Sequence, residues 1–87
     1  MRAKYVIFDG SLCTRTFIFG NETQHKEMAQ LMAAVYPGII PVSAGFVSIT
    51  EVDSLTDEVK VWGKSDSLNL SSRPEDERII KNSIKLY

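Results

Sequence analysis

The chain has 87 residues, with ten lysines and arginines against eleven aspartates and glutamates, and 44% of its residues are apolar. This length predicts a single domain over residues 1–87, because two halves would each lack an adequate core. The net charge of −1 and the scattered basic residues argue against nucleic-acid binding, which depends on neutralising phosphates. The single cysteine, Cys13, excludes an internal disulfide and a cysteine-based zinc site.

The opening residues MRAKYVIFDG contain an apolar run of only four residues before Asp9. A signal peptide needs a longer apolar region, and a membrane-spanning helix needs about 20 apolar residues. We therefore expect a cytoplasmic protein that does not associate with membranes. No cofactor is expected from the sequence.

Residues 3–9 and 12–19 are rich in β-branched and aromatic side chains, and the turn signal Gly10-Ser11 separates them. They predict an antiparallel hairpin. The apolar stretches Tyr5–Phe8 and Phe17–Phe19 are continuous instead of alternating. This pattern indicates strands that are covered on both faces, by a helix or by another subunit.

Residues 22–36 are predicted to form a helix. Asn21 is a favourable N-cap and Gln24 stands at the capping-box position, while Pro37-Gly38 ends the segment. One apolar face recurs at spacings of three and four residues, formed by Met28, Leu31, Met32, Val35 and Tyr36.

Residues 39–52 form the longest predicted strand. Pro41 should confine strand pairing to the residues beyond it, and Gly45 is interpreted as a bulge. Residues 58–63 predict a further strand, and the alternation in 67–70 favours a short last one.

Residues 73–86 are predicted to form a second helix. Ser72 and Glu75 have capping-box spacing, and Pro74 occupies an early helical position where its missing N–H is not needed. The buried side of this helix should carry Ile79, Ile80, Ile84 and Tyr87.

The element order is therefore β-β-α-β-β-(β)-α. Tight turns require antiparallel pairing, so we expect an α+β fold with one antiparallel sheet of four to five strands. Both helices are predicted to pack on this sheet as a two-layer sandwich. That arrangement would leave the other face of the sheet to water or to a partner.

The tripeptide Gly63-Lys64-Ser65 is also found in phosphate-binding loops. Such a loop needs a glycine at position 58, where this chain has Glu58, and a helix that starts at the lysine. The tripeptide is therefore interpreted as a polar hairpin turn. Residues 6–12 approach the first motif of haloacid-dehalogenase-type phosphatases, but Ile7 occupies the position of the nucleophilic aspartate.

His25 is the only histidine of the chain, and two interpretations remain for it. It is either a partly buried structural or interface residue, which we favour, or a general base whose orienting partner the sequence does not identify. Cys13 is likewise a small core residue or an active thiol, and the first reading is preferred. No catalytic residue and no metal site are predicted.

Residues 43–80, which contain SAGFVSI and VWGKSDSLNLSSRPEDERII, resemble small uncharacterised proteins of phage and bacterial genomes. The resemblance implies a phage or prophage accessory protein. It implies no activity and no catalytic residue.

The leading hypothesis is a small non-enzymatic interaction module that self-associates as a homodimer or larger oligomer and contacts an unknown protein partner. The expected contact residues are Phe17, Phe19, Phe46, Trp62 and Tyr87. The alternative is a small-molecule or anion-binding domain with possible enzymatic activity. Its site would be formed by His25, Ser71, Ser72 and Arg73.

Overall fold

The computed structural model describes residues 2–10, 13–51 and 57–84 of the chain. Its elements follow the predicted order: β1 (Arg2–Asp9), β2 (Thr14–Phe19), α1 (His25–Val35), β3 (Ile40–Glu51), β4 (Asp57–Trp62), β5 (Lys64–Ser65), β6 (Leu70–Ser71) and α2 (Asp76–Ile84).

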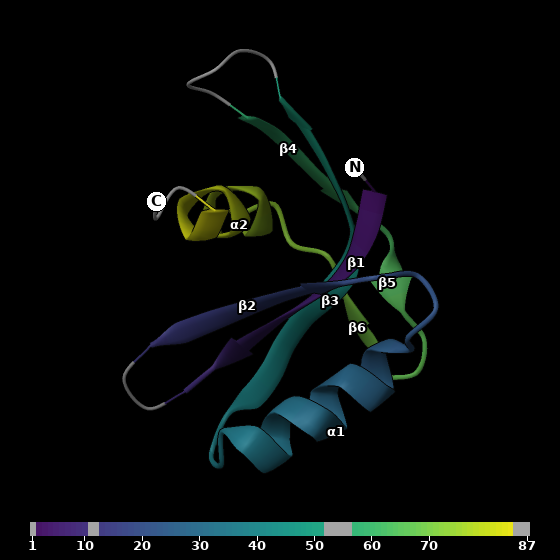
Figure 1. The fold of residues 1–87 in the computed structure, drawn as a ribbon, viewed down its shortest axis with the longest axis vertical. Coiled ribbons are helices and arrows are strands. Elements are labelled where there is room, and N and C mark those ends of the chain that lie inside the picture. Colours follow the sequence, from purple (N-terminus) through teal and green to yellow (C-terminus); the bar gives the residue numbers. More distant parts are fainter. Residues whose placement is uncertain (1, 11–12, 52–56, 85–87) are drawn as a thin grey trace.

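Four of the strands form one antiparallel sheet in the order β2-β1-β3-β4. The remaining strands, β5 and β6, form a separate two-stranded sheet beside β3. Figure 1 shows the strongly twisted main sheet between the two helices, with α1 and α2 on different sides of it. The predicted α+β class is confirmed.

The two helices pack on opposite faces of the sheet, so the predicted two-layer sandwich is wrong. Tyr5 and Ile7 of β1 share a buried cluster with Ile80 of α2, whereas Val6 and Phe8 share another with Ala29 of α1. The physical reason lies in β1 itself. Successive side chains of a strand point to opposite faces, so a continuous apolar run needs a cover on each face. The prediction that the apolar run of β1 is covered on both faces is confirmed.

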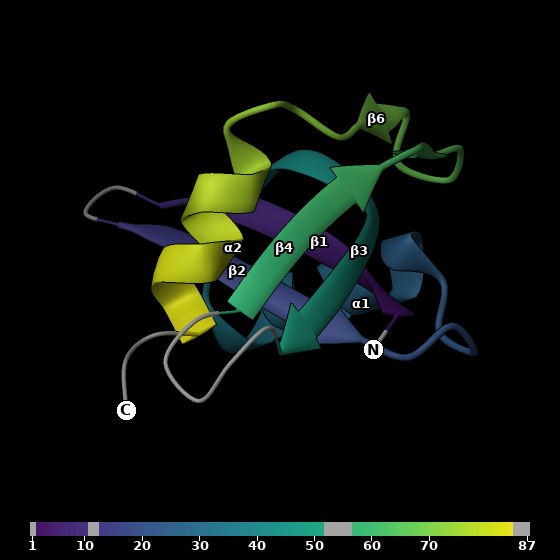
Figure 2. The ribbon, with the colours of Figure 1, turned by 90° about the horizontal axis from the view of Figure 1, so that it is seen from above.

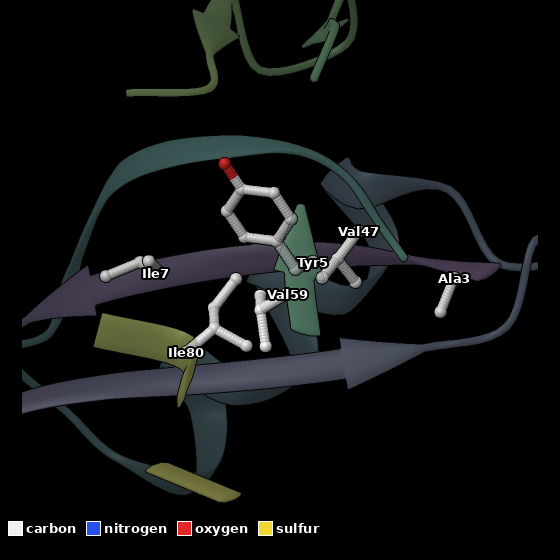
Figure 3. Close-up of a cluster of buried hydrophobic side chains, with 6 residues drawn as sticks. All are labelled: Ala3, Tyr5, Ile7, Val47, Val59 and Ile80. Carbon is white, nitrogen blue, oxygen red and sulfur yellow. The ribbon is translucent and has the colours of Figure 1, made fainter. Parts of the chain in front are cut away.

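The cluster on the α2 face is drawn in Figure 3, and it consists of Ala3, Tyr5, Ile7, Val47, Val59 and Ile80. Ile80 is fully buried, and burial of a side chain of this size stabilises the fold by about 2 kcal/mol. The Tyr5 ring lies over Val59 and Ile80 with its hydroxyl directed away from them (Figure 3). The hydroxyl of Tyr5 bonds Asp76 and thereby holds the first turn of α2.

Helix α1 begins at His25, three residues later than predicted, and its N-cap is Gln24 instead of Asn21. Gln24 makes no side-chain capping bond. Instead, the backbone N–H of Lys26 donates to Ser67 Oγ at 3.3 Å, from the turn between β5 and β6. A distant hydroxyl thus bonds a free N–H of the first turn, and this sequence separation explains why local capping rules misplaced the helix start.

Strand β3 has nearly the predicted bounds, but its pairing is not confined to the residues beyond Pro41, since Pro41 and Ile40 pair with Phe8 and Asp9 of β1. The register shift lies at this end, opposite Ile7 and Phe8, and not at Gly45. Gly45 is needed for a different reason. A Cβ atom there would lie 2.7 Å from the backbone oxygen of Trp62, closer than a side-chain carbon can approach.

The predicted short strand over residues 67–70 is wrong except at its last residue. Residues 66–69 turn the chain between β5 and β6, and Asn69 adopts a φ of 55°, which asparagine tolerates better than most residues. Gly63, with a φ of 78°, separates β4 from β5. Its backbone oxygen accepts a hydrogen bond from Ser72 N–H at 3.0 Å, which closes the base of the β5–β6 hairpin.

Helix α2 begins with a capping arrangement one residue later than predicted. Asp76 Oδ2 accepts from the backbone N–H of Arg73 at 2.9 Å, so this pair replaces the expected Ser72–Glu75 box. The helix itself begins at Asp76, so Pro74 lies in the turn before it and not at the early helical position that was predicted. Of the predicted buried residues, Ile80 is buried and Ile79 is half-buried, while Tyr87 lies outside the described residues.

Candidate functional site

The aromatic residues predicted as contacts differ widely in exposure. Phe19 is buried in the α1-face cluster, and Phe17 packs edge-on against Phe8 with ring centroids 5.5 Å apart. Phe46 is half-buried and stacks on Trp62 at 6.1 Å. Only Trp62, with 42% of its surface exposed, presents a large area to solvent within this set. Tyr87 lies outside the part of the chain that the structure describes.

His25 is buried between Phe19 and Phe46, whose rings meet it edge-on at 5.5 and 5.8 Å. Its Nε2–H donates to the backbone oxygen of Gly45 at 2.9 Å. Burial lowers the pKa of the imidazole, the Gly45 carbonyl acts in the opposite direction, and the nearby Lys4 charge lowers it further. These surroundings join α1 to β3 and are those of a structural histidine.

Tyr5, Asp76 and Arg73 form a buried polar group on the other face of the sheet. The Tyr5 hydroxyl donates to Asp76 Oδ2 at 2.6 Å, and Arg73 Nε donates to Asp76 Oδ1 at 3.0 Å. Tyr5 and Asp76 are both fully buried. Burial raises the pKa of the Tyr5 phenol far above its usual range, and the hydrogen bond and charge of Asp76 raise it further. The group anchors the start of α2 to the middle strand β1.

The residues of the alternative anion site are not assembled into one site. His25 belongs to the α1 face, whereas Arg73 is engaged by Asp76 on the α2 face. Ser71 is exposed in β6, and Ser72 packs against Gly45. An anion that approaches Arg73 would therefore meet the negative charge of Asp76 beside it.

The tripeptide Gly63-Lys64-Ser65 was predicted to be a polar hairpin turn, but Lys64 and Ser65 form strand β5 and the turn itself lies at residues 66–69. Lys64 is exposed in β5 and pairs with the exposed Asp66 at 3.5 Å. The buried Ser65 hydroxyl accepts a hydrogen bond from Leu68 N–H at 3.2 Å. The next element is the strand β6 and not a helix, so no phosphate cradle forms here.

The outer edge of β2 is an open strand edge. Strand β2 is the first strand of the sheet order, and every second residue of an edge strand directs its N–H and C=O away from the sheet. Within residues 2–10, 13–51 and 57–84, no hydrogen bond engages these outward groups. The strand has the sequence TRTFIF, without a proline or a register shift, and Arg15 is its only charged residue. Features that commonly prevent edge pairing are therefore missing from β2.

Helix α2 occupies part of the outer edge of β4. The backbone N–H of Val61 donates to Glu77 Oε2 at 3.1 Å, so an outward donor of this edge already has a partner. Figure 2 shows α2 lying alongside β4, and β4 also carries the charged side chains of Glu58 and Lys60. Both features hinder the addition of another strand.

Sequence reasoning missed Asp76 and Glu77, which it treated as dipole-compensating acids of a helix end. Asp76 could have been recognised, because an acid three residues after Arg73, with a proline between them, has capping-box spacing. No local signal identifies Glu77 as the partner of β4. That role depends on the path of α2 across the sheet.

Comparisons with protein families, with curated proteins and with solved structures found no match. In the described ranges, no helix has the length and apolar character needed to cross a membrane. The same residues contain no group of three or more potential metal-ligating side chains.

Proposed function

We propose that the protein is a small self-associating interaction module, and that the edge of β2 is its contact surface. The observation that carries this proposal is the difference between the two edges of the sheet. The β2 edge offers free backbone donors and acceptors, whereas α2 engages the β4 edge through Glu77. Strand addition at an open edge gains main-chain hydrogen bonds without a preformed pocket.

A second copy of the chain is the proposed occupant. Two β2 strands related by a two-fold axis perpendicular to the sheet pair antiparallel, with Thr16 opposite Thr16 or Phe17 opposite Phe17. In either register Arg15 lies opposite a phenylalanine of the other copy instead of a second arginine. Like charges thus stay apart, and with Phe17 opposite Phe17 two aromatic side chains also meet across the strands, which favours pairing. As part of the same proposal, the module is a phage or prophage accessory protein, which the resemblance of residues 43–80 supports.

The proposal is tested with two matched lysine substitutions. Ile18 of β2 and Val61 of β4 are both half-buried residues packed against the α2-face cluster, at opposite edges of the sheet. Ile18→Lys and Val61→Lys should therefore destabilise the fold to similar extents, but only Ile18→Lys places a charge at the proposed contact. Light scattering should give a dimer for the wild type and for Val61→Lys, and a monomer for Ile18→Lys.

A wild-type monomer at high micromolar concentration would overturn self-association. Equal effects of the two lysines on the dimer would place the contact elsewhere than at the β2 edge. Chemical denaturation of both variants shows whether their stabilities are matched.

A further inference from the structure

A cleft lies between the turn after β1 and the turn that joins α1 to β3. Its volume is about 380 Å³, within the range of small-molecule sites. Cys13 and Arg15 line it from the hairpin side, and Val35, Tyr36 and Ile39 line it from the other side. The cleft shares Arg15 with β2 but is present in a single copy of the chain, so ligand binding there does not depend on the proposed function.

Among the described residues that line this cleft, Arg15 alone is charged. Its guanidinium carbon lies 4.3 Å from the centre of the Tyr36 ring, and that ring packs in turn on Phe17, with centroids 6.1 Å apart. Stacking holds the guanidinium plane and leaves its N–H groups at the rim of the stack. The ion pairs among the described residues do not include Arg15. A pre-positioned cation thus lies in the cleft without an anionic partner there.

The walls beside this cation are apolar. Val35 is 56% exposed, and Ile39 and Pro37 continue the apolar lining. A planar guanidinium matches a planar carboxylate through two parallel hydrogen bonds, and apolar walls favour a ligand with a hydrocarbon body. A single cation is a weak match for a doubly charged phosphate.

We propose that this cleft binds a small apolar carboxylate, with Arg15 binding the carboxylate group and Val35 and Ile39 contacting the hydrocarbon part. Tyr36 acts as the platform that positions Arg15. Nothing larger than a small molecule is implied by the volume of the cleft.

Cys13 provides the reporter for the test. It is the only cysteine of the chain, its side chain is exposed, and it lines the same cleft. A ligand in the cleft should therefore slow the alkylation of Cys13 by iodoacetamide, an uncharged reagent. The probe is benzoate, and benzamide is its uncharged counterpart of nearly the same shape.

Benzoate at millimolar concentrations should slow alkylation, and benzamide should not. Arg15→Gln should weaken the binding of benzoate about tenfold or more, the effect of losing a charge-assisted hydrogen bond. Arg78→Gln is the matched control, because Arg78 is an exposed arginine of α2 that does not line the cleft. Tyr36→Leu should weaken benzoate binding to a smaller extent while it leaves the charge of Arg15 in place.

Equal protection by benzoate and benzamide, or full protection in Arg15→Gln with a native circular dichroism spectrum, would overturn the carboxylate site. Protection by inorganic phosphate at the same concentrations would overturn the preference for an apolar carboxylate. The rates of Cys13 alkylation are also measured on Ile18→Lys, because pairing of two copies at β2 would itself shield Cys13. Benzoate protection in that variant separates the cleft from the proposed self-association.

Discussion

The outer strands β2 and β4 are each six residues long and lie at opposite edges of the same sheet, yet their outward backbone groups have different surroundings. At β4, a carboxylate from α2 bonds the Val61 N–H. At β2, no described residue bonds the outward groups. An exposed row of backbone donors and acceptors is a template for another strand. In the proposed self-association, α2 would therefore favour pairing at the β2 edge by occupying part of the β4 edge.

Removing the Tyr5–Asp76 hydrogen bond, which anchors α2, should have the largest effect on the difference between the two edges. Tyr5→Phe removes the hydroxyl that bonds the fully buried Asp76. An incompletely bonded buried carboxylate should lower the free energy of unfolding at pH 7 by about 1–3 kcal/mol. Urea denaturation of the variant and the wild type measures this change, and an unchanged midpoint would show that the anchor does not hold α2.

The same substitution should alter the response to alkaline pH. The pKa of Tyr5 is raised in the folded state, so the folded protein keeps the phenol proton after the unfolded chain has lost it. The stability contributed by this group is therefore present below pH 10 and is lost as the pH rises above that value. The difference in stability between the wild type and Tyr5→Phe should shrink above pH 10.

The carboxylate at the β4 edge should have a smaller effect on stability but a specific effect on association. Glu77→Ala removes the acceptor of the Val61 N–H and should lower the free energy of unfolding by about 1 kcal/mol. It also opens a second edge, so assemblies larger than a dimer should appear in sedimentation velocity experiments. Glu75→Ala is the control, because it removes an exposed acid next to the same helix start without changing β4. Identical sedimentation of the two variants would contradict the role given to Glu77.

Lowering the pH should produce the smallest of these changes in stability. The pKa of His25 is lowered by burial, and the opposing hydrogen bond to Gly45 limits the shift. A lowered pKa means that the unfolded chain binds a proton first, so stability falls as the pH decreases below 6.5, the ordinary value of the group. His25→Asn should remove this dependence between pH 7 and the folded-state pKa, as measured by thermal unfolding. Because the hydrogen bond of His25 goes to Gly45 of β3 and not to an outward backbone group of either edge strand, dimer formation should follow only the loss of folded protein.

The sequence was sufficient to predict the element order, because each element carries its own local pattern. The continuous apolar run Tyr5–Phe8 also indicated a strand covered on both faces. The run did not show that one helix covers each face. A strand that is apolar on both sides needs apolar neighbours there, but its own sequence does not say which elements supply them. The starts of both helices were misplaced because their capping partners, Ser67 and Asp76, were not the nearest candidates. The edge contact of Glu77 depends on tertiary packing alone.

The most direct test of the central claim is residue-resolved hydrogen exchange of β2 and β4 at increasing protein concentration. Every second amide of Thr14–Phe19 should become protected as the concentration rises, because those N–H groups gain partners in a second copy. The Val61 amide should be equally protected at all concentrations, since Glu77 of the same chain bonds it. Exchange of the β2 amides that does not depend on concentration, or concentration-dependent protection at β4, would contradict the assignment of self-association to the β2 edge.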